Sequence, residues 1–159
     1  MARRYAQIQV SIWSDEDFKA LTAAEQHMYF VLLSQARINL CGVLDYMPSR
    51  LAMCVYEWTT DDVERLLKGL TDKRYIVVDY DSGELLLRSF IRNDGLLKSP
   101  NVTKGAAAEF GEIMSDKLRT VITKELKRAF EEDPTLAGWK GLKETNPVLF
   151  KNVTEKGSR

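Results

Sequence analysis

The hydrophobic pattern of this chain changes its period part-way along the sequence. In the segment 60–73 the apolar residues recur at offsets of three, four and seven, which predicts an amphipathic helix. The runs 75–80 and 85–90 are instead rich in β-branched, aromatic and leucine residues. The turn sequence at 81–84 separates them, so the pair is expected to form an antiparallel hairpin. A helix followed by a hairpin strongly limits the folds open to this segment.

Two more helices and a strand are predicted before this point. Thr22 and Glu25 have the spacing of a capping box, and apolar residues follow at intervals of three and four to about Arg37. The short β-rich stretch 43–46 predicts one small strand. A proline then suits the first turn of a helix over about 48–55.

The order helix, short strand, helix, helix, hairpin is typical of a winged helix-turn-helix. We therefore expect an α+β, mainly α fold with a winged-helix domain over residues 1–98. The helices 48–55 and 59–73 would form the helix-turn-helix, and the hairpin would be the wing. Other small α+β folds share this element order and remain an alternative.

The remainder of the chain is predicted to contain a linker, a long helix and a tail. The linker covers 99–105, a single amphipathic helix covers 106–132, and 133–159 is expected to be a loosely ordered tail. The helix could pack on its own domain or on a second subunit, and we favour a homodimer because paired winged helices bind repeated half-sites. The predicted dimer stripe comprises Phe110, Met114, Leu118, Val121, Ile122, Leu126 and Phe130.

Composition limits the classes of function. Lys plus Arg and Asp plus Glu each number 23, so any nucleic-acid binding must depend on a local patch. The chain has no apolar run of about 20 residues and no apolar signal segment near its start, so we expect a cytoplasmic protein with no membrane partner. Cys41 and Cys54 are expected to be reduced, largely structural thiols, because a zinc site would lack ligands.

The sequence offers little for catalysis. His27 is the only histidine, and no triad can be assembled without a second base. No glycine-rich phosphate loop of the P-loop or Rossmann type is present. We expect a non-enzymatic protein that uses no metal, cofactor or small-molecule substrate.

Several short motifs occur in an order known from one family. They are Arg-Arg-Tyr at 3–5, Ile-Trp-Ser-Asp at 12–15, Leu-Thr-Ala-Ala-Glu-Gln at 21–26, Gly-Val-Leu at 42–44, Leu-Thr-Asp-Lys-Arg-Tyr-Ile at 70–76 and Phe-Ile-Arg-Asn-Asp at 90–94. With them, the first hundred residues resemble the N-terminal domain of phage replisome organisers, the DnaD-like winged-helix replication initiators. The resemblance implies a domain that binds DNA at an origin, with helicase-loading machinery recruited through a C-terminal module. The sequence after Lys104 departs from the family, because it lacks the tyrosine and tryptophan pattern of that module.

A recognition helix over 60–73 would present polar and basic side chains to DNA. Arg65 and Lys68 are the candidates for the major groove, together with Thr60 near the start of the helix. The front of the helix is acidic, which capping explains but which also suits an ordinary solvated face. The candidate phosphate contacts elsewhere are Arg3, Arg4, Arg50, Lys73, Arg74, Arg88, Arg92 and Lys98.

Two hypotheses of function follow. The first is a phage or prophage protein that binds double-stranded DNA through its winged helix, in replication initiation or in transcriptional regulation, and that is associated with the nucleoid when bound. The second is a protein-interaction adaptor on the same scaffold that binds a host or replisome protein. The neutral net charge and the acidic front of the 60–73 helix favour the adaptor.

Overall fold

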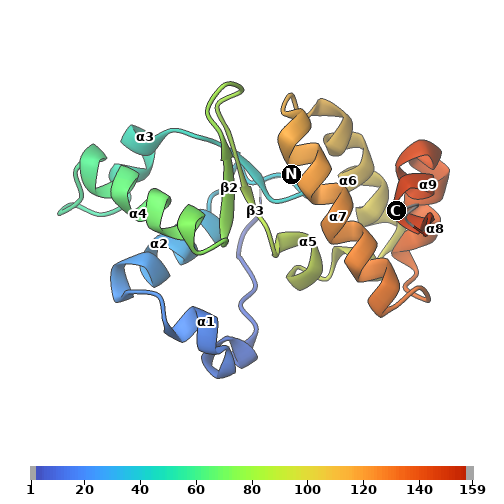
Figure 1. Ribbon diagram of the computed structural model, residues 1–159, viewed down its shortest axis with the longest axis horizontal. Helices are drawn as coiled ribbons and strands as arrows, with labels where there is room; N and C mark the ends of the chain where they lie inside the picture. Colours follow the sequence, from blue (N-terminus) through green and yellow to red (C-terminus); the bar gives the residue numbers. More distant parts are fainter. Residues whose placement is uncertain (1–2, 157–159) are drawn as a thin grey trace.

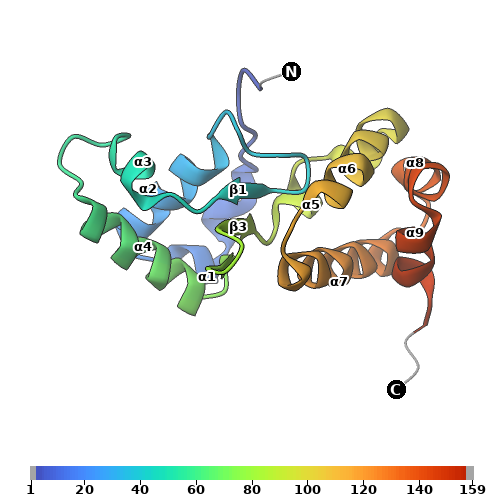
Figure 2. The ribbon, with the colours of Figure 1, turned by 90° about the horizontal axis from the view of Figure 1, so that it is seen from above.

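The computed structural model describes residues 3–156. Within this range the chain is mainly helical, with one three-stranded antiparallel sheet near the middle of the molecule (Figures 1 and 2). The predicted α+β, mainly α class is therefore confirmed.

The first part of the chain follows the predicted order of elements. The α2 and α4 helices begin with capping boxes, formed by Thr22 with Glu25 and by Thr59 with Asp62. The last predicted strand is shorter than expected, because Phe90 leaves the sheet and starts a short helix. The elements are η1 Val10–Ser14, α1 Glu16–Lys19, α2 Ala23–Leu33, β1 Val43–Asp45, α3 Pro48–Ala52, α4 Thr60–Asp72, β2 Ile76–Asp79, β3 Glu84–Leu87, α5 Phe90–Asn93 and η2 Leu96–Lys98.

The sheet has the order β1-β3-β2, with β3 paired to both neighbours. Side chains on one face of the sheet join the N-terminal core, and those on the other face join the C-terminal core. The N-terminal core includes Phe18, Met28, Leu32, Val63, Leu67, Leu70, Leu44, Ile76, Val78, Leu85 and Leu87. The C-terminal core includes Val43, Leu86, Ile91, Leu118, Ile122, Leu126, Trp139, Leu142, Leu149 and Val153.

The segment predicted as a linker is instead the start of the helix α6, Pro100–Glu112. Ser99 caps this helix by accepting a hydrogen bond from the Val102 N–H at 3.3 Å, and Pro100 occupies the first turn. A serine followed by a proline is a favourable helix start. The linker predicted over 99–105 is therefore wrong, because Pro100 starts a helix at this point.

The predicted single helix over 106–132 is broken into α6 and a second helix, α7, Asp116–Glu132. Ile113 adopts an extended conformation after α6, and its side chain is buried. Ser115 then caps α7 by accepting a hydrogen bond from the Leu118 N–H at 3.0 Å. The apolar stripe continues through the break, so periodicity alone did not reveal it.

The segment predicted as a loose tail folds into the helices α8, Gly138–Thr145, and α9, Pro147–Thr154. These helices pack on α6 and α7, respectively, and on each other (Figure 2). Trp139 and Leu142 of α8 are buried in the C-terminal core, and Gly141 allows α8 to approach the backbone of α6 at Pro100. Burial of these apolar groups opposes the entropy cost of ordering the segment. Residues 157–159 of the predicted tail lie outside the described residues.

The predicted dimer stripe packs mostly within the chain. Leu118, Ile122 and Leu126 are buried in the C-terminal core, and Phe110, Val121 and Phe130 pack against it. Met114 is exposed in the turn between α6 and α7. The expectation that these residues form an open surface for a second subunit is therefore corrected, because α8 and α9 supply the apolar surface that the stripe needs. The homodimer itself stays a prediction.

Candidate nucleic-acid interface

The outer side of α4 is exposed, as predicted. Val63, Leu67 and Leu70 bury the inner side of this helix against α2 and α3. The side chains of Arg65 and Lys68 are 75% and 74% exposed. The structure therefore leaves both candidate groove-reading residues accessible to a large ligand.

These two cations have acidic partners on the same helix. Arg65 pairs with Asp62, and the Nζ atom of Lys68 lies 2.9 Å from a carboxylate oxygen of Asp72. Hydrogen bonds from Thr59 hold the pKa of Asp62 below its ordinary value, and the Asp72 carboxylate raises the pKa of Lys68. The charged residues of α4 are Asp61, Asp62, Glu64, Asp72, Arg65 and Lys68. Carboxylates therefore outnumber cations on this helix.

The loop between α3 and α4 adds exposed groups that the sequence analysis did not select. Met53 and Tyr56 are both exposed there. Arg50 and Thr60 are exposed nearby, and Arg50 has no carboxylate partner within residues 3–156. Large apolar residues in the short loop between two predicted helices could have identified these exposed groups from the sequence.

The tip of the hairpin lies next to the outer side of α4. The rings of Tyr46 and Tyr80 form an edge-to-face pair with centroids 5.2 Å apart, and Tyr80 is exposed. Burial raises the pKa of Tyr46, with smaller contributions from Tyr80 and from the carboxylate of Glu64 on α4. We call the surface formed by Arg50, Tyr56, Thr60, Glu64, Arg65, Lys68 and Tyr80 the α4 surface.

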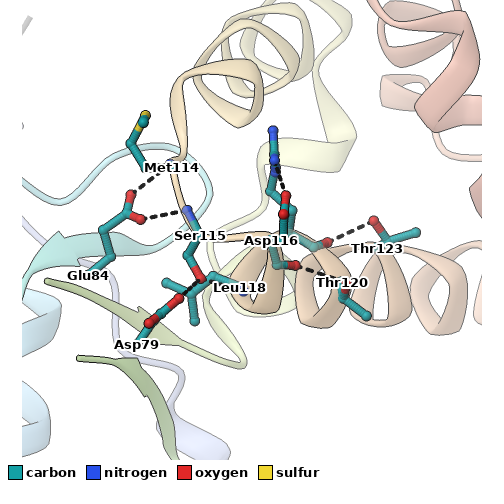
Figure 3. A network of polar contacts seen from close by, with 9 residues as sticks. Asp79, Glu84, Met114, Ser115, Asp116, Leu118, Thr120 and Thr123 are labelled. Atoms are coloured by element: carbon teal, nitrogen blue, oxygen red, sulfur yellow. Dashed lines mark hydrogen bonds and ion pairs between the residues drawn. The ribbon is translucent and has the colours of Figure 1, made fainter. Parts of the chain in front are cut away.

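The side of the hairpin away from α4 is fastened to the turn between α6 and α7 (Figure 3). The Ser115 N–H donates to Glu84 Oε1 at 2.8 Å, and the Met114 N–H donates to Glu84 Oε2 at 3.2 Å. The Ser115 hydroxyl lies 2.6 Å from Asp79 Oδ2 and donates to it. This bond holds the pKa of Asp79 below its ordinary value. The hairpin is consequently not a free wing on that side.

Several predicted phosphate contacts instead join parts of the chain to each other. Arg3 pairs with Asp94 at 2.6 Å and lies over the ring of Phe90. Arg92 pairs with Glu132 of α7. Lys73 and Arg88 bind buried carboxylates, Glu25 at 2.6 Å and Glu125 at 3.4 Å, respectively. These four cations have intramolecular partners in the fold, which the sequence could not show because the partners are distant along the chain.

The other predicted phosphate contacts remain accessible. Arg4, Arg74 and Lys98 are exposed and have no carboxylate partner in the range 3–156. Arg74 adopts a left-handed backbone conformation with φ 66°, between α4 and β2.

The two cysteines and the histidine differ in their surroundings. Cys41 is buried, its thiol donates to the Ala106 carbonyl at 3.3 Å, and burial raises its pKa to about 12. Cys54 is exposed, which corrects its expected structural role. The His27 ring packs edge-on against Trp58, with centroids 5.5 Å apart. The described residues contain no group of three or more potential metal ligands.

Comparisons with known proteins found nothing that matches this chain, whether among family models, curated proteins or solved structures. Among the helices that the structure describes, none combines the length and apolar character needed to cross a membrane.

Proposed function

We propose that this protein binds double-stranded DNA through the α4 surface, with α3 and α4 acting as a winged helix-turn-helix. The observation that carries the proposal is the exposed outer side of α4 next to an antiparallel hairpin, in the element order typical of that fold. The resemblance of the first hundred residues to phage replisome organisers supports the same function. Replication initiation and transcriptional regulation are the two roles that this binding would serve.

The ion pairs on α4 are compatible with such binding. Exposed pairs such as Arg65 with Asp62 contribute little to stability, so a phosphate or a guanine edge can replace the carboxylate at small cost. The surplus of carboxylates on α4 nevertheless weakens non-specific attraction. We therefore expect modest affinity for random duplexes and a preference for particular sequences.

The test is selection of duplexes from a random library, followed by fluorescence anisotropy across a range of salt concentrations. We expect enrichment of a defined site, with affinity that falls as salt rises. The variant Arg65→Gln/Lys68→Gln should lose the preference for that site. Lys140→Gln/Lys143→Gln on α8 removes the same charge away from α4 and serves as the control. Failure to enrich any sequence, together with salt-insensitive binding, would rule out the proposal.

The second candidate is an adaptor that binds a protein through the α4 surface. The exposed side chains of Met53, Tyr56 and Tyr80 beside the acidic α4 favour it, because exposed aromatic and Met residues are typical of protein interfaces. Affinity purification from nuclease-treated host lysate discriminates between the two. A stoichiometric partner that is lost on Tyr56→Ala, but not on Tyr5→Ala, would support the adaptor.

A further inference from the structure

Several positively charged residues lie where β2 meets α7. Arg74 precedes β2, Arg88 follows β3, and Lys117, Lys124 and Arg128 belong to α7. We call these five residues the β2–α7 junction. In both views of the ribbon, α7 and α4 lie on opposite sides of the hairpin (Figures 1 and 2).

Hydrogen bonds join the members of the junction. Lys117 Nζ donates to the Val78 carbonyl of β2 at 2.9 Å. Arg88 Nη1 donates to the Arg74 carbonyl at 3.4 Å, and its Nη2 donates to Glu125 Oε1 at 3.4 Å. Arg128 Nη1 reaches the same carboxylate oxygen at 3.3 Å. Arg88 and Arg128 therefore share one carboxylate, while bonds to backbone carbonyls place Lys117 against β2 and Arg88 against the residue before it. Lys124 takes no part in these bonds.

Positive charge exceeds negative charge among the residues of the junction, although Asp15 and Asp17 line the same cavity as Arg74 and Arg88. The buried carboxylate of Glu125 is shared by Arg88 and Arg128. Arg74 and Lys124 have no carboxylate partner between residues 3 and 156. Asp79 on β2 accepts the Ser115 hydroxyl and also lies close enough to Lys117 for that cation to help lower its pKa. In contrast to the helix α4, where acids outnumber cations, the junction carries a net positive charge.

The cations on α7 are also arranged in a line. Lys117, Lys124 and Arg128 are separated by seven and four residues, which places them on one side of a helix, away from the buried side that carries Leu118 and Ile122. At 1.5 Å per residue they span about 16 Å, which is close to the rise of five base pairs of duplex DNA. Glu131 lies further along the same side and ends the basic stretch.

We propose that the β2–α7 junction is a second surface that binds the phosphate backbone of double-stranded DNA. This inference rests on the proposed DNA-binding function. In this arrangement the two surfaces have different roles. The α4 surface supplies the sequence preference, and the junction supplies attraction to phosphates that does not depend on sequence. It also gives the C-terminal helices a direct part in binding, in addition to their packing against the sheet.

The test compares the purified full chain with Arg74→Gln/Lys124→Gln, two positions without ion-pair partners in the fold. Anisotropy titrations would use several unrelated duplexes of about 20 base pairs, two helical turns, at a series of salt concentrations. We expect the slope of log affinity against log salt to fall by about two, roughly one per phosphate contact, and affinity to drop by the same factor for every duplex. Lys140→Gln/Lys143→Gln on α8 should bind like the unmodified chain.

The outcomes separate this inference from the proposed function. If the unmodified chain selects a DNA site but the junction variant keeps its salt slope, the junction proposal is wrong and the function stands. An equal loss in the α8 control would show a general effect of charge and would also overturn it. If the unmodified chain binds no duplex, both proposals fail. Circular dichroism melting of each variant confirms that the fold is unchanged.

Discussion

Different layers of helices cover the two faces of the small sheet. The sequence predicted the helices of one layer better than those of the other. On one face, α2 and α4 have capping boxes and clear apolar periods. On the other face, helices α6 to α9 are separated by short breaks within continuous apolar patterns. The first layer could be predicted. In the second, the helix predicted over 106–132 covers α7 and half of α6, but the start of α6, the break between the two helices, and the helices α8 and α9 were not predicted. The difference shows that a hairpin assigned as a wing on element order can be fixed on both faces.

The strands themselves carried a signal of this arrangement. Ile76, Val77 and Val78 are consecutive apolar residues, and so are Leu85, Leu86 and Leu87. A strand with one face in water alternates apolar and polar residues, whereas a strand buried on both faces reads as a continuous apolar run. Both strands of the hairpin show the continuous apolar run, because the C-terminal layer covers Leu86 on the second face of the sheet.

The largest effect is expected from Leu86→Ala, which tests whether the C-terminal layer covers the hairpin. Leu86 is 1% exposed and belongs to the C-terminal core, so we expect a loss of about 2–5 kcal/mol in the free energy of unfolding, from lost burial and the cavity left behind. Urea denaturation measures this loss. Val148→Ala, at a side chain that is 69% exposed, should cost less than about 0.5 kcal/mol. A Leu86→Ala cost as small as that of the control would mean that the C-terminal layer does not cover the hairpin.

The close packing of α8 on α6 is tested by Gly141→Ala. A Cβ at this position would overlap the carbonyl oxygen of Pro100, so overpacking should cost about 1–3 kcal/mol despite the better helix propensity of alanine. Gly111→Ala in α6 is the matched control, because a Cβ there meets no atom within 4 Å. That change should stabilise the protein by up to about 1 kcal/mol. Thermal melting of both variants should give shifts of opposite sign, and two positive shifts would contradict the docking of α8.

The attachment of the hairpin to the α6–α7 turn is tested by Ser115→Ala. The change removes the cap of α7 and the bond to Asp79, and should cost about 1–2 kcal/mol at neutral pH. Ser115→Thr keeps a hydroxyl and should retain most of the stability.

Ser115→Ala should also change the acid sensitivity of the fold. The hydroxyl lowers the Asp79 pKa from its ordinary 3.8, so ionised Asp79 stabilises the fold above that pH, and the contribution is lost as the pH falls through the lowered pKa. Part of the stability lost on acidification should therefore be absent in the variant. Urea titrations above and below the ordinary pKa measure it, and identical pH profiles would show that Ser115 does not act on Asp79.

The smallest effect is expected on α4. Lys68→Gln breaks an exposed pair with Asp72 and should leave the free energy of unfolding almost unchanged. Lys73→Gln, one turn further along, removes the partner of the buried Glu25 and should cost more. Chemical denaturation of the pair of variants checks the ranking. Equal costs would show that Lys68 has a structural role, and would weaken its assignment to the α4 surface.

The features of the candidate site also differ in whether the local sequence could predict them. The exposure of Arg65 and Lys68 follows from the helical period, and it was predicted. The intramolecular pairs of Arg3 with Asp94 and of Arg92 with Glu132 were not predicted, because each joins residues tens of positions apart. Similarly, no local pattern indicated that Arg88 and Arg128 share one buried carboxylate.

By itself, the sequence determined the helices α2 and α4, the hairpin and the mainly helical class, because capping and periodicity act over a few residues. Only the tertiary structure decided that the apolar stripe of α7 faces α8 and α9, and that cations near the hairpin meet α7. Burial of apolar surface has no direction of its own, so an amphipathic helix specifies which side it buries but not which partner covers it.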